Sequence, residues 1–297
     1  MVRRIGVLMG GTSSEREVSL KSGQAVSNAL KGLGYTVIDI DAGPDVCARL
    51  KAEAIDAAFI ALHGGVGEDG SIQGLLDVLG IPYTGSGVLA SALAMDKPAS
   101  KVMFRARGLN VPGYAVVAKG EPYVSERFPL VVKPSREGSS VGVFIVSGPD
   151  ELKAALSAAT AFDGRAVVED HIAGAEVQIA IMAGRPLGGV EVRPHSGFYS
   201  YENKYTAGRT DYIIPPAIDA SAYEAAKLAA LGAHEALGCR GATRVDLIVD
   251  AAGTPYVLEV NTIPGMTETS LLPKIAASAG LDFPALIDGI LKEALKS

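Results

Sequence analysis

The stretch VLEVNTIPGMT, Val257–Thr267, reads as a buried strand that runs into a turn, yet it carries a carboxylate and an amide. Side chains two residues apart in a strand leave the same face, so Glu259 and Asn261 share one face. Leu258 and Val260 are then expected on the other face. A strand rich in Val and Leu is not expected to have a polar face unless that face has a function. The residue paired with Glu259 on the neighbouring strand is therefore informative.

The residues before this strand predict its partner. The segment TRVDLIVDAAGTPYVLEVN, 243–261, predicts a β-hairpin whose loop lies between the paired residues Asp250 and Pro255. Counting back along both strands places Asp246 opposite Glu259. Two carboxylates that face each other destabilise a sheet unless a cation lies between them, and oxygen-only ligands suit Mg²⁺ that arrives with a nucleotide. The alternative is a sheet face that points into solvent.

The composition excludes several classes of partner. A net charge of −6 over 297 residues argues against a nucleic-acid-binding protein or one held on an anionic membrane surface. No apolar stretch approaches the roughly 18 residues of a membrane span, and the start MVRRIGVLMGGTSS is too weakly apolar for a signal peptide. Cys47 and Cys239 stand apart, so we expect neither a disulfide framework nor a zinc site. These features predict a cytoplasmic protein with a small-molecule or protein partner.

The first third of the chain alternates strands with helices, which predicts a parallel, helix-covered sheet. IGVLM, 5–9, is followed by two glycines and a helix that we expect to open at a capping box, Ser14-x-x-Glu17. AAFIAL, 57–62, leads into a second Gly-rich loop and helix. In such sheets, ligands bind where strand ends meet Gly-rich loops. Asp96, followed by Pro98, is expected to cap a further helix at a domain boundary.

The rest of the chain is predicted to be α+β. Short strands from residue 111 to about 172 surround a Gly/Ser loop, with a helix near 150–159. Two strands, a long polar loop over 195–212 and a helix with a capping box at Ser221-x-x-Glu224 precede the hairpin. We expect that polar loop to be mobile without ligand, because it has little apolar surface to hold it.

The segment KPSREGSSVG, 133–142, is the candidate phosphate loop. The chain has neither a GxxxxGK[ST] motif nor a GxGxxG after its first strand, so both common nucleotide cradles are missing. A flexible Gly138–Gly142 loop with Ser139 and Ser140 can instead close over phosphates through backbone N–H groups, while Lys133 supplies charge. The alternative is an ordinary Gly/Ser hairpin loop.

The order of these motifs resembles that of the D-alanine–D-alanine ligases of the ATP-grasp superfamily. The matching stretches span almost the whole chain: GGTSSEREVSL, ALHGGVGEDGSIQG, PYTGSG with MDK, VVKPSREGSSVGV, NKYTAG, RVDLIVD and LEVNTIPGMTETSL. The resemblance implies an ATP-grasp fold, in which an N-terminal parallel-sheet α/β domain precedes two α+β domains that sandwich ATP. The implied domains are residues 1–95, 96–173 and 174–297.

The resemblance also assigns the nucleotide and metal sites. Lysines would meet the phosphates, while Glu169, Ile172 and Glu176 would hold adenine and ribose. The full set expected to bind ATP is Lys97, Lys133, Ser140, Glu169, Ile172, Glu176 and Lys204. The family's metal ligands correspond to Asp246, Glu259 and Asn261, which agrees with the hairpin argument. Two Mg²⁺ ions are expected, which Mn²⁺ could replace.

The amino-acid site follows in the same way. Glu15 would bind the ammonium group of the first D-alanine, in a pocket lined by Val18 and His63. Arg244 and the Gly265 N–H would bind its carboxylate and later an oxyanion, and Ser270 with Leu271 would receive the second carboxylate. Ser139 and Tyr205 would link Glu15 to the closing loop. The catalytic set is thus Glu15, Ser139, Tyr205, Arg244, Gly265 and Ser270.

Several of these residues have simpler explanations. Glu15 could favour a helix N-terminus, His63 could be a buried structural imidazole, Lys97 could be surface charge and Tyr205 could be a lid residue. His171, His195 and His234 are interpreted as structural.

The implied reaction is ATP-dependent ligation of two D-alanines through an acyl phosphate, for peptidoglycan precursor synthesis by a homodimer. The alternatives are a D-alanine–D-lactate ligase or another ATP-grasp carboxylate–amine ligase. The chain lacks the GxGxxG motif expected of a dinucleotide-dependent oxidoreductase, which argues against that class. A non-catalytic binding module would not explain the paired carboxylates.

Overall fold

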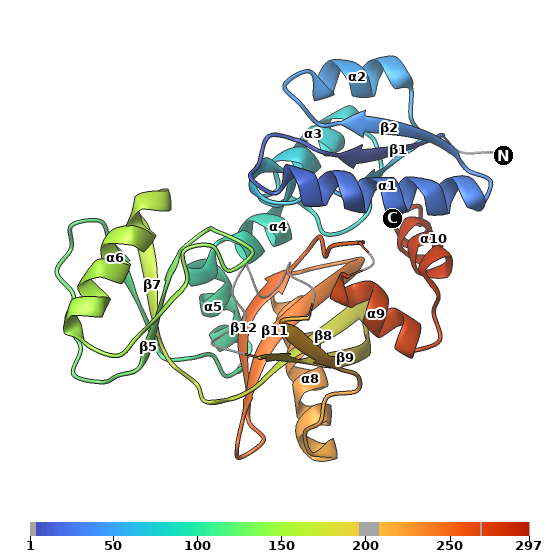
Figure 1. The fold of residues 1–297 in the computed structure, drawn as a ribbon. Coiled ribbons are helices and arrows are strands. Elements are labelled where there is room, and N and C mark those ends of the chain that lie inside the picture. Colours follow the sequence, from blue (N-terminus) through green and yellow to red (C-terminus); the bar gives the residue numbers. More distant parts are fainter. Residues whose placement is uncertain (1–3, 196–207, 268, 297) are drawn as a thin grey trace.

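The N-terminal part of the chain folds into the predicted parallel sheet. The computed structural model describes residues 4–195, 208–267 and 269–296. Strands β1 (Arg4–Met9), β2 (Thr36–Asp41) and β3 (Ala57–Ile60) pair in the order β2-β1-β3 (Figure 1). Their connections carry α1 (Arg16–Gly32), α2 (Val46–Glu53), the 3₁₀ turn η1 (Gly65–Gly67) and α3 (Ser71–Leu79).

This sheet is buried on both faces, as a parallel sheet requires. Ile5 and Val7 pack with Val26 and Leu30 of α1. Leu8, on the opposite face of β1, packs in a second cluster with side chains of α2 and α3. The nearly continuous apolar run of β1 is therefore explained by helices above and below it.

The helix start at Ser14 was predicted wrongly. Helix α1 begins at Arg16 with Glu15 at its N-cap, and no side chain caps it. The hydroxyl of Ser13 instead donates to the carbonyl of His63 at 2.5 Å and accepts from the Glu15 N–H at 3.2 Å. This contact with the loop after β3 sets the entry of the chain into the helix, so a non-local bond replaced the local capping box.

The second capping box is also wrong, whereas the Asp96 cap is confirmed. Helix α8 (Ala220–Ala236) begins after Asp219, so Ser221 already lies inside it and cannot cap it. Helix α4 (Val88–Met95) is followed by α5 (Lys97–Ala106), and the Asp96 carboxylate accepts from the Ala99 N–H at 3.1 Å. The other carboxylate oxygen binds Arg136 and Arg165 at 3.0 and 2.9 Å.

The middle of the chain forms an antiparallel sheet with its own hydrophobic core. Strands β4 (Tyr114–Ala118), β5 (Leu130–Pro134), β6 (Phe144–Val146) and β7 (Arg165–Asp170) pair in the order β4-β7-β5-β6. Helix α6 (Pro149–Asp163) covers one face. The buried side chains of this cluster all lie between Val117 and Val168.

A third sheet, also antiparallel, contains the hairpin. Strands β8 (Gly174–Met182), β9 (Arg185–Pro194), β10 (Thr210–Ile213), β11 (Ala242–Asp250) and β12 (Pro255–Asn261) pair in the order β10-β9-β8-β11-β12. Helix α8 packs on one face, and α9 (Leu271–Ser278) and α10 (Phe283–Ala294) follow the hairpin. In the described part of the chain, no helix has the length and apolarity needed to cross a membrane.

The hairpin closes one residue earlier than predicted. Val249, not Asp250, lies opposite Pro255. The Asp250 carboxylate accepts from the N–H groups of Ala252 and Thr254, both at 2.9 Å, and its own N–H donates to the Thr254 carbonyl at 3.1 Å. Asp250 therefore belongs to the turn, because its side chain satisfies the backbone of the loop.

A β-bulge restores the predicted opposition of the carboxylates. The register shifts between Asp246 and Leu247 so that Leu258 becomes an extra residue, and Asp246 lies opposite Glu259 after all. The prediction that Leu258 leaves the opposite face from Glu259 is wrong, since both line one cavity. Val260 is buried with side chains of α8.

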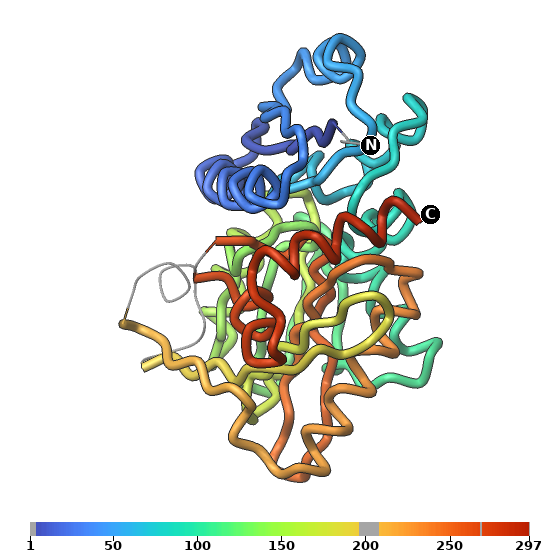
Figure 2. Tube along the Cα trace, turned by 90° about the vertical axis from the view of Figure 1, so that its right-hand side faces the viewer, coloured from blue at the N-terminus to red at the C-terminus, as the bar shows by residue number. Residues whose placement is uncertain are grey.

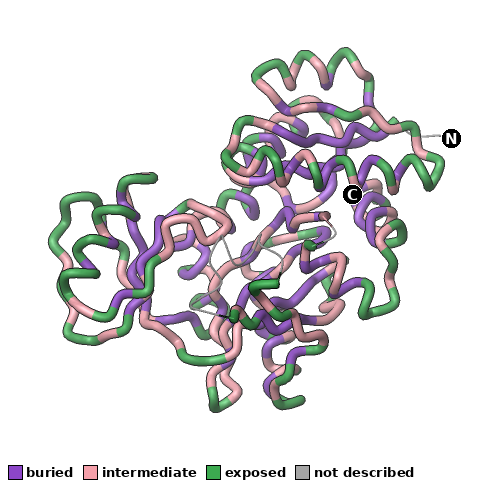
Figure 3. Tube along the Cα trace, in the orientation of Figure 1, coloured by how far each residue is buried: buried purple, intermediate pink, exposed green. Residues whose placement is uncertain are grey.

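The first and last parts of the chain share a single hydrophobic core. Side chains of β1, α1 and β3 pack in one cluster with those of β8, β9, α9 and α10. Helix α10 packs across α1, so the C-terminal end returns to the N-terminal sheet (Figure 2). The buried residues follow the strands of all three sheets, with exposed residues mainly on the outer helices and loops (Figure 3).

Candidate active site

Two adjoining cavities lie between the three sheets. The first cavity extends from α1 to the loop after β12, and the second lies between β5–β7 and the hairpin β11–β12. The predicted residues that line the first are Glu15, Val18, His63, Ser139, Arg244, Asn261, Gly265, Ser270 and Leu271. Those that line the second are Lys133, Ser140, Glu169, Ile172, Glu176 and Asp246. Lys97, Glu137, Gly138 and Glu259 line both.

The second cavity combines an apolar wall with a charged end. Val131, Val143, Ile145, Ile248 and Leu258 supply apolar surface, suited to a flat ring. The charged end carries Lys97 and Lys133 together with the carboxylates of the hairpin. His171, interpreted from the sequence as structural, also lines this cavity.

A buried ion cluster anchors one wall of the second cavity. Glu169 Oε1 lies 2.9 Å from Lys133 Nζ and 2.9 Å from Lys101 Nζ, and all three side chains are at most 8% exposed. Burial lowers the pKa of Lys101 to about 8, although Glu169 opposes the change. Burial also raises the pKa of Glu169, but the two lysines outweigh it and hold that pKa below its ordinary value. The cluster keeps one excess positive charge near the cavity.

Lys101 was missed from the sequence. It lies one helical turn after Lys97 on α5 and is fully buried, where an ionised lysine is rare without a partner. Residues four apart share one face of a helix, so the position of Lys97 could have indicated that Lys101 also faces the site.

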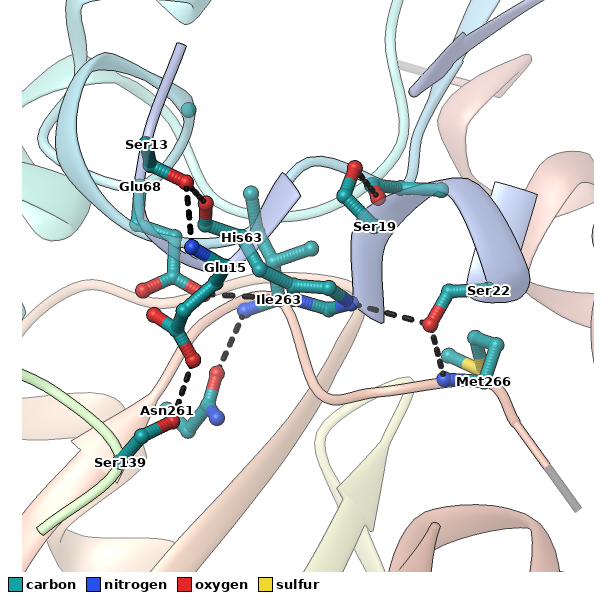
Figure 4. Close-up of polar contacts among 12 residues, drawn as sticks. Ser13, Glu15, Ser19, Ser22, His63, Glu68, Ser139, Asn261, Ile263 and Met266 are labelled. Atoms are coloured by element: carbon teal, nitrogen blue, oxygen red, sulfur yellow. Dashed lines mark hydrogen bonds and ion pairs between the residues drawn. The ribbon is translucent and has the colours of Figure 1, made fainter. Parts of the chain in front are cut away.

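The loop after β5 has an unusual backbone. Ser139 and Ser140 have φ of 51° and 58°, in the left-handed region that non-glycine residues seldom adopt. Such strain persists where surrounding contacts hold it and is common at ligand-binding loops. Here the Ser139 hydroxyl donates to Glu15 Oε1, so the loop of the central sheet contacts the N-terminal part of the chain (Figure 4). The predicted link between Ser139 and Glu15 is present.

Lys97 joins this loop to the hairpin. Its ammonium group donates to the Glu137 carbonyl and lies 3.7 Å from Glu259 Oε2. Burial lowers the pKa of Lys97, and Glu259 opposes this effect. The interpretation of Lys97 as ordinary surface charge is wrong, because the residue is only 6% exposed.

The paired carboxylates have cations beside them within the protein. The Arg244 guanidinium binds both oxygens of Asp246, with Nε–Oδ1 at 2.7 Å and Nη2–Oδ2 at 2.9 Å. Lys97 lies beside Glu259. Arginine and lysine therefore balance the charge that the sequence assigned to a metal alone.

The donor set still fits a magnesium ion. Asp246 and Glu259 offer carboxylate oxygens to the second cavity, and Asn261 lines the adjoining first cavity. No group of three or more His, Cys, Asp or Glu residues suited to a metal occurs among the described residues. Two carboxylates and an amide suit Mg²⁺, which keeps several water or phosphate ligands and needs few from the protein.

His63 links three elements beneath the first cavity. Its Nε2 lies 3.1 Å from the Ser22 hydroxyl of α1, and its Nδ1 lies 3.6 Å from Glu68 Oε1 (Figure 4). The Ser22 hydroxyl also accepts from the Met266 N–H at 3.2 Å. Glu68 lines the first cavity as well, although the sequence gave no reason to single it out.

Gly265 and Ser270, in the loop after β12, line the first cavity. A Cβ on Gly265 would lie 2.7 Å from Ser270 Oγ, so a larger residue here would displace the Ser270 hydroxyl. Ser270 Oγ accepts from the Thr267 N–H at 3.0 Å. Ser270 is the N-cap of α9 without a side-chain cap bond, which leaves the first N–H groups of the helix available to a carboxylate near Leu271.

Two predicted residues, one histidine and Gln178 remain to be described. Lys204 and Tyr205 lie outside the described residues. His234 is buried beside Thr243 Oγ1 at 2.8 Å, and burial lowers its pKa, which fits a structural role. Gln178, which the sequence analysis missed, is buried opposite Asp246 on β8 and lines the first cavity.

The chain matches two family models. The model described as D-ala D-ala ligase C-terminus matches residues 103–292, and that described as D-ala D-ala ligase N-terminus matches residues 44–86. A D-alanine–D-alanine ligase of Syntrophotalea carbinolica is 51% identical over 291 residues, which cover 97% of this chain and 95% of the relative.

Solved structures show the same similarity. The D-alanine–D-alanine ligase from Bacillus anthracis complexed with ATP is 38% identical, with a TM-score of 0.87 over 99% of this chain and 98% of that chain. The VanG D-Ala:D-Ser ligase from Enterococcus faecalis is 30% identical, with a TM-score of 0.86 over 99% of this chain and 100% of that chain.

Proposed function

Because the chain belongs to the D-alanine–D-alanine ligase family, we propose that it joins two D-alanine molecules to D-alanyl-D-alanine, driven by ATP, for cell-wall peptidoglycan synthesis. One observation carries the proposal: a cavity with lysines and carboxylates adjoins a cavity with Glu15 and Arg244 across Lys97 and Glu259. Two reactants held on either side of this boundary can exchange a phosphoryl group.

The second cavity is the proposed nucleotide site. Its apolar wall, Ile172 and Glu176 would hold adenine and ribose, while Lys97, Lys133 and Ser140 would meet the phosphates. The left-handed backbone at Ser140 can turn N–H groups toward anions. The role proposed for Lys204 rests on the sequence alone.

The hairpin is the proposed metal site. Asp246, Glu259 and Asn261 would hold Mg²⁺, with two ions expected and Mn²⁺ able to replace them. When bound, the metal neutralises charge on the phosphate oxygens. Arg244, which binds both Asp246 oxygens, also lines the first cavity, where it would contact the substrate.

The first step forms an acyl phosphate. A carboxylate does not react with an amine, because its oxygen is a poor leaving group. An oxygen of the first D-alanine carboxylate attacks the γ-phosphorus, and ADP leaves. Glu15 would bind the ammonium group of that D-alanine, beside Val18 and His63. Lys97, at the boundary of the cavities, is placed to neutralise the transferring group.

The second step forms the peptide bond. The amine of the second D-alanine attacks the acyl carbon and loses one proton as the amide forms. Phosphate leaves with the former carboxylate oxygen and can accept that proton. Arg244 and the Gly265 N–H would stabilise the tetrahedral oxyanion. Ser270, Leu271 and the first turn of α9 would hold the second carboxylate. The loop that binds Glu15 through Ser139 would exclude water from the acyl phosphate.

A ligase with another second substrate is the remaining alternative. The similarity to a D-Ala:D-Ser ligase supports it, since that structure covers the same length of chain. The proposed assignment to D-alanine rests on the similarity to D-alanine–D-alanine ligases.

We also propose the division into residues 1–95, 96–173 and 174–297, supported by one sheet in each segment. The proposed location is the cytoplasm, and the proposed assembly is a homodimer. No partner other than ATP and D-alanine is proposed.

The decisive experiment measures phosphate release from ATP with purified protein. Release should require D-alanine and Mg²⁺, and the dipeptide should accumulate in equal amount. L-alanine and a reaction without amino acid serve as controls. Equal release in all three reactions would contradict the proposal.

A further inference from the structure

Ser22 connects the two sides of the first cavity without lining it. Its side chain on α1 is fully buried, and it contacts both the loop after β12 and the loop after β3 (Figure 4). The Met266 N–H donates to its hydroxyl at 3.2 Å, and His63 Nε2 lies 3.1 Å from the same oxygen. Met266 is itself buried in the core shared by the first and last sheets.

The arrangement determines where the hydroxyl proton goes. Ser22 Oγ accepts from Met266, and no other acceptor for its proton than His63 Nε2 occurs among the contacts of the described residues. A buried hydroxyl rarely leaves its proton without an acceptor. Ser22 therefore donates to Nε2. The neutral imidazole must then carry its own proton on Nδ1, which faces Glu68 Oε1 at 3.6 Å.

We propose that Ser22 is a positioning residue for the reaction. This inference rests on the proposed function. Through the Met266 N–H it fixes the peptide that follows Gly265, whose own N–H would bind the oxyanion. Through Nε2 it holds His63 in the Nδ1–H tautomer and thereby orients the ring beside the first D-alanine. One hydroxyl on α1 thus aligns groups from two distant loops.

Ser19 offers a matched control on the same helix. It is also fully buried, accepts from the Gly10 N–H at 2.9 Å and donates to the Ala61 carbonyl at 2.8 Å. These contacts tie the ends of β1 and β3 to α1 but do not reach His63 or Met266. Ser19→Ala and Ser22→Ala should therefore destabilise the protein by similar amounts, but only Ser22→Ala should affect His63 and turnover.

The first experiment reads the tautomer of His63 directly. The chain has four histidines, so ¹⁵N imidazole spectra of the full-length protein are simple, and His63→Gln assigns the signal. The wild-type and Ser19→Ala proteins should show the Nδ1–H form. Ser22→Ala should shift the signal toward a mixture of tautomers. An unchanged His63 signal in Ser22→Ala would overturn the proposal.

The second experiment separates binding from chemistry. Ser22→Ala should lower kcat about 10-fold or more, short of the 10²–10³-fold that follows loss of a whole oxyanion donor. The KM for ATP should be unchanged, because neither Ser22 nor the His63 and Met266 that it contacts line the second cavity. Ser22→Thr, which keeps the hydroxyl, should restore most of kcat. An equal loss of kcat in Ser19→Ala, or no rescue by threonine in a folded variant, would contradict the proposal.

These outcomes are distinct from failure of the proposed function. If the wild-type protein made no D-alanyl-D-alanine, the proposed reaction would be wrong. The tautomer measurement would still decide whether Ser22 sets the protonation of His63.

Discussion

Asp246 and Glu259 lie opposite each other across β11 and β12, and each carboxylate has its own cation, Arg244 and Lys97 respectively. The opposition depends on the bulge at Leu258, because the turn itself closes one residue out of the predicted register. A bulge at this position turns Glu259 toward the same cavity as Asp246. The site is therefore built by a local irregularity of the sheet.

The substitutions Asp246→Asn and Glu259→Gln should each abolish ligation while the fold is kept, because both carboxylates are proposed to serve the metal. Turnover is measured across a Mg²⁺ titration, with circular dichroism as the control for folding. Near wild-type turnover at saturating Mg²⁺ in either variant would refute the metal assignment. Asp246→Asn should also lower thermal stability without metal, since Arg244 loses its partner. If the two carboxylates only repelled each other, Asp246→Asn would instead raise thermal stability.

Glu169→Gln should destabilise the protein by about 3–5 kcal/mol near neutral pH, because two buried ammonium groups lose their shared counter-charge. The loss should shrink as pH rises toward about 8 and level off above it, because above the pKa of Lys101 the buried amine is neutral in the wild-type protein as well. Urea unfolding at several pH values measures it. The control Glu235→Gln removes an exposed pair with Arg107 and should change stability by about 0–1 kcal/mol. Equal effects would refute the role of the cluster.

Asp96 should make stability sensitive to acid. Burial raises its pKa, but hydrogen bonds from the Ala99 N–H, Arg136 and Arg165 outweigh this and hold the pKa below its ordinary value. A carboxylate with a lowered folded pKa contributes stability above its unfolded pKa of about 3.9, and that contribution is lost as pH falls through the folded pKa. Asp96→Asn keeps a good helix cap but removes the charge, so it should flatten the fall in stability below about pH 4. Parallel stability curves for the two proteins would count against this.

Ser139 and Ser140 are neighbours that serve different cavities, so their alanine variants should differ. Ser139→Ala removes the bond to Glu15 and should raise the KM for D-alanine more than that for ATP. Ser140 lines only the second cavity, so Ser140→Ala should show the reverse pattern. Initial rates with each substrate varied in turn give the two ratios. The same ratio in both variants would mean that the loop acts as one unit.

Tyr205→Phe tests the choice of second substrate. Tyr205 lies outside the described residues, so the prediction rests on the resemblance, in which phenylalanine at this position accompanies D-alanyl-D-lactate synthesis. The variant should keep ligation but gain ester formation with D-lactate, most clearly at mildly acidic pH, where protonated D-alanine is a poor nucleophile. Chromatography of products from mixed substrates measures the ratio. No change in the ratio would leave Tyr205 as a lid residue.

The sequence predicted those features that depend on local pattern or on the order of motifs. The parallel sheet, the hairpin, the Asp96 cap and many of the residues that line the cavities follow from alternation, turn residues and motif matches. Non-local bonds caused the errors: Ser13 binds His63 and moves the start of α1, which overrides the capping box at Ser14. The contacts of Lys101 with Glu169 and of Ser22 with Met266 could not be predicted either, because the partners are distant in sequence.

The central sheet, β4–β7 with α6, has a core separate from the one shared by the first and last sheets. The first sheet (β1–β3) and the last sheet (β8–β12) share one core. They must move together, because separating them would expose the apolar side chains of that core to water. The central sheet has its own cluster, packs Tyr114 of β4 against the cluster around α8, and contacts α1 through the bond from Ser139 to Glu15. Moving the central sheet would break polar contacts and the packing of Tyr114 but would leave its own core intact. Hydrogen exchange should therefore find the central sheet opening at a lower free energy than the first and last sheets.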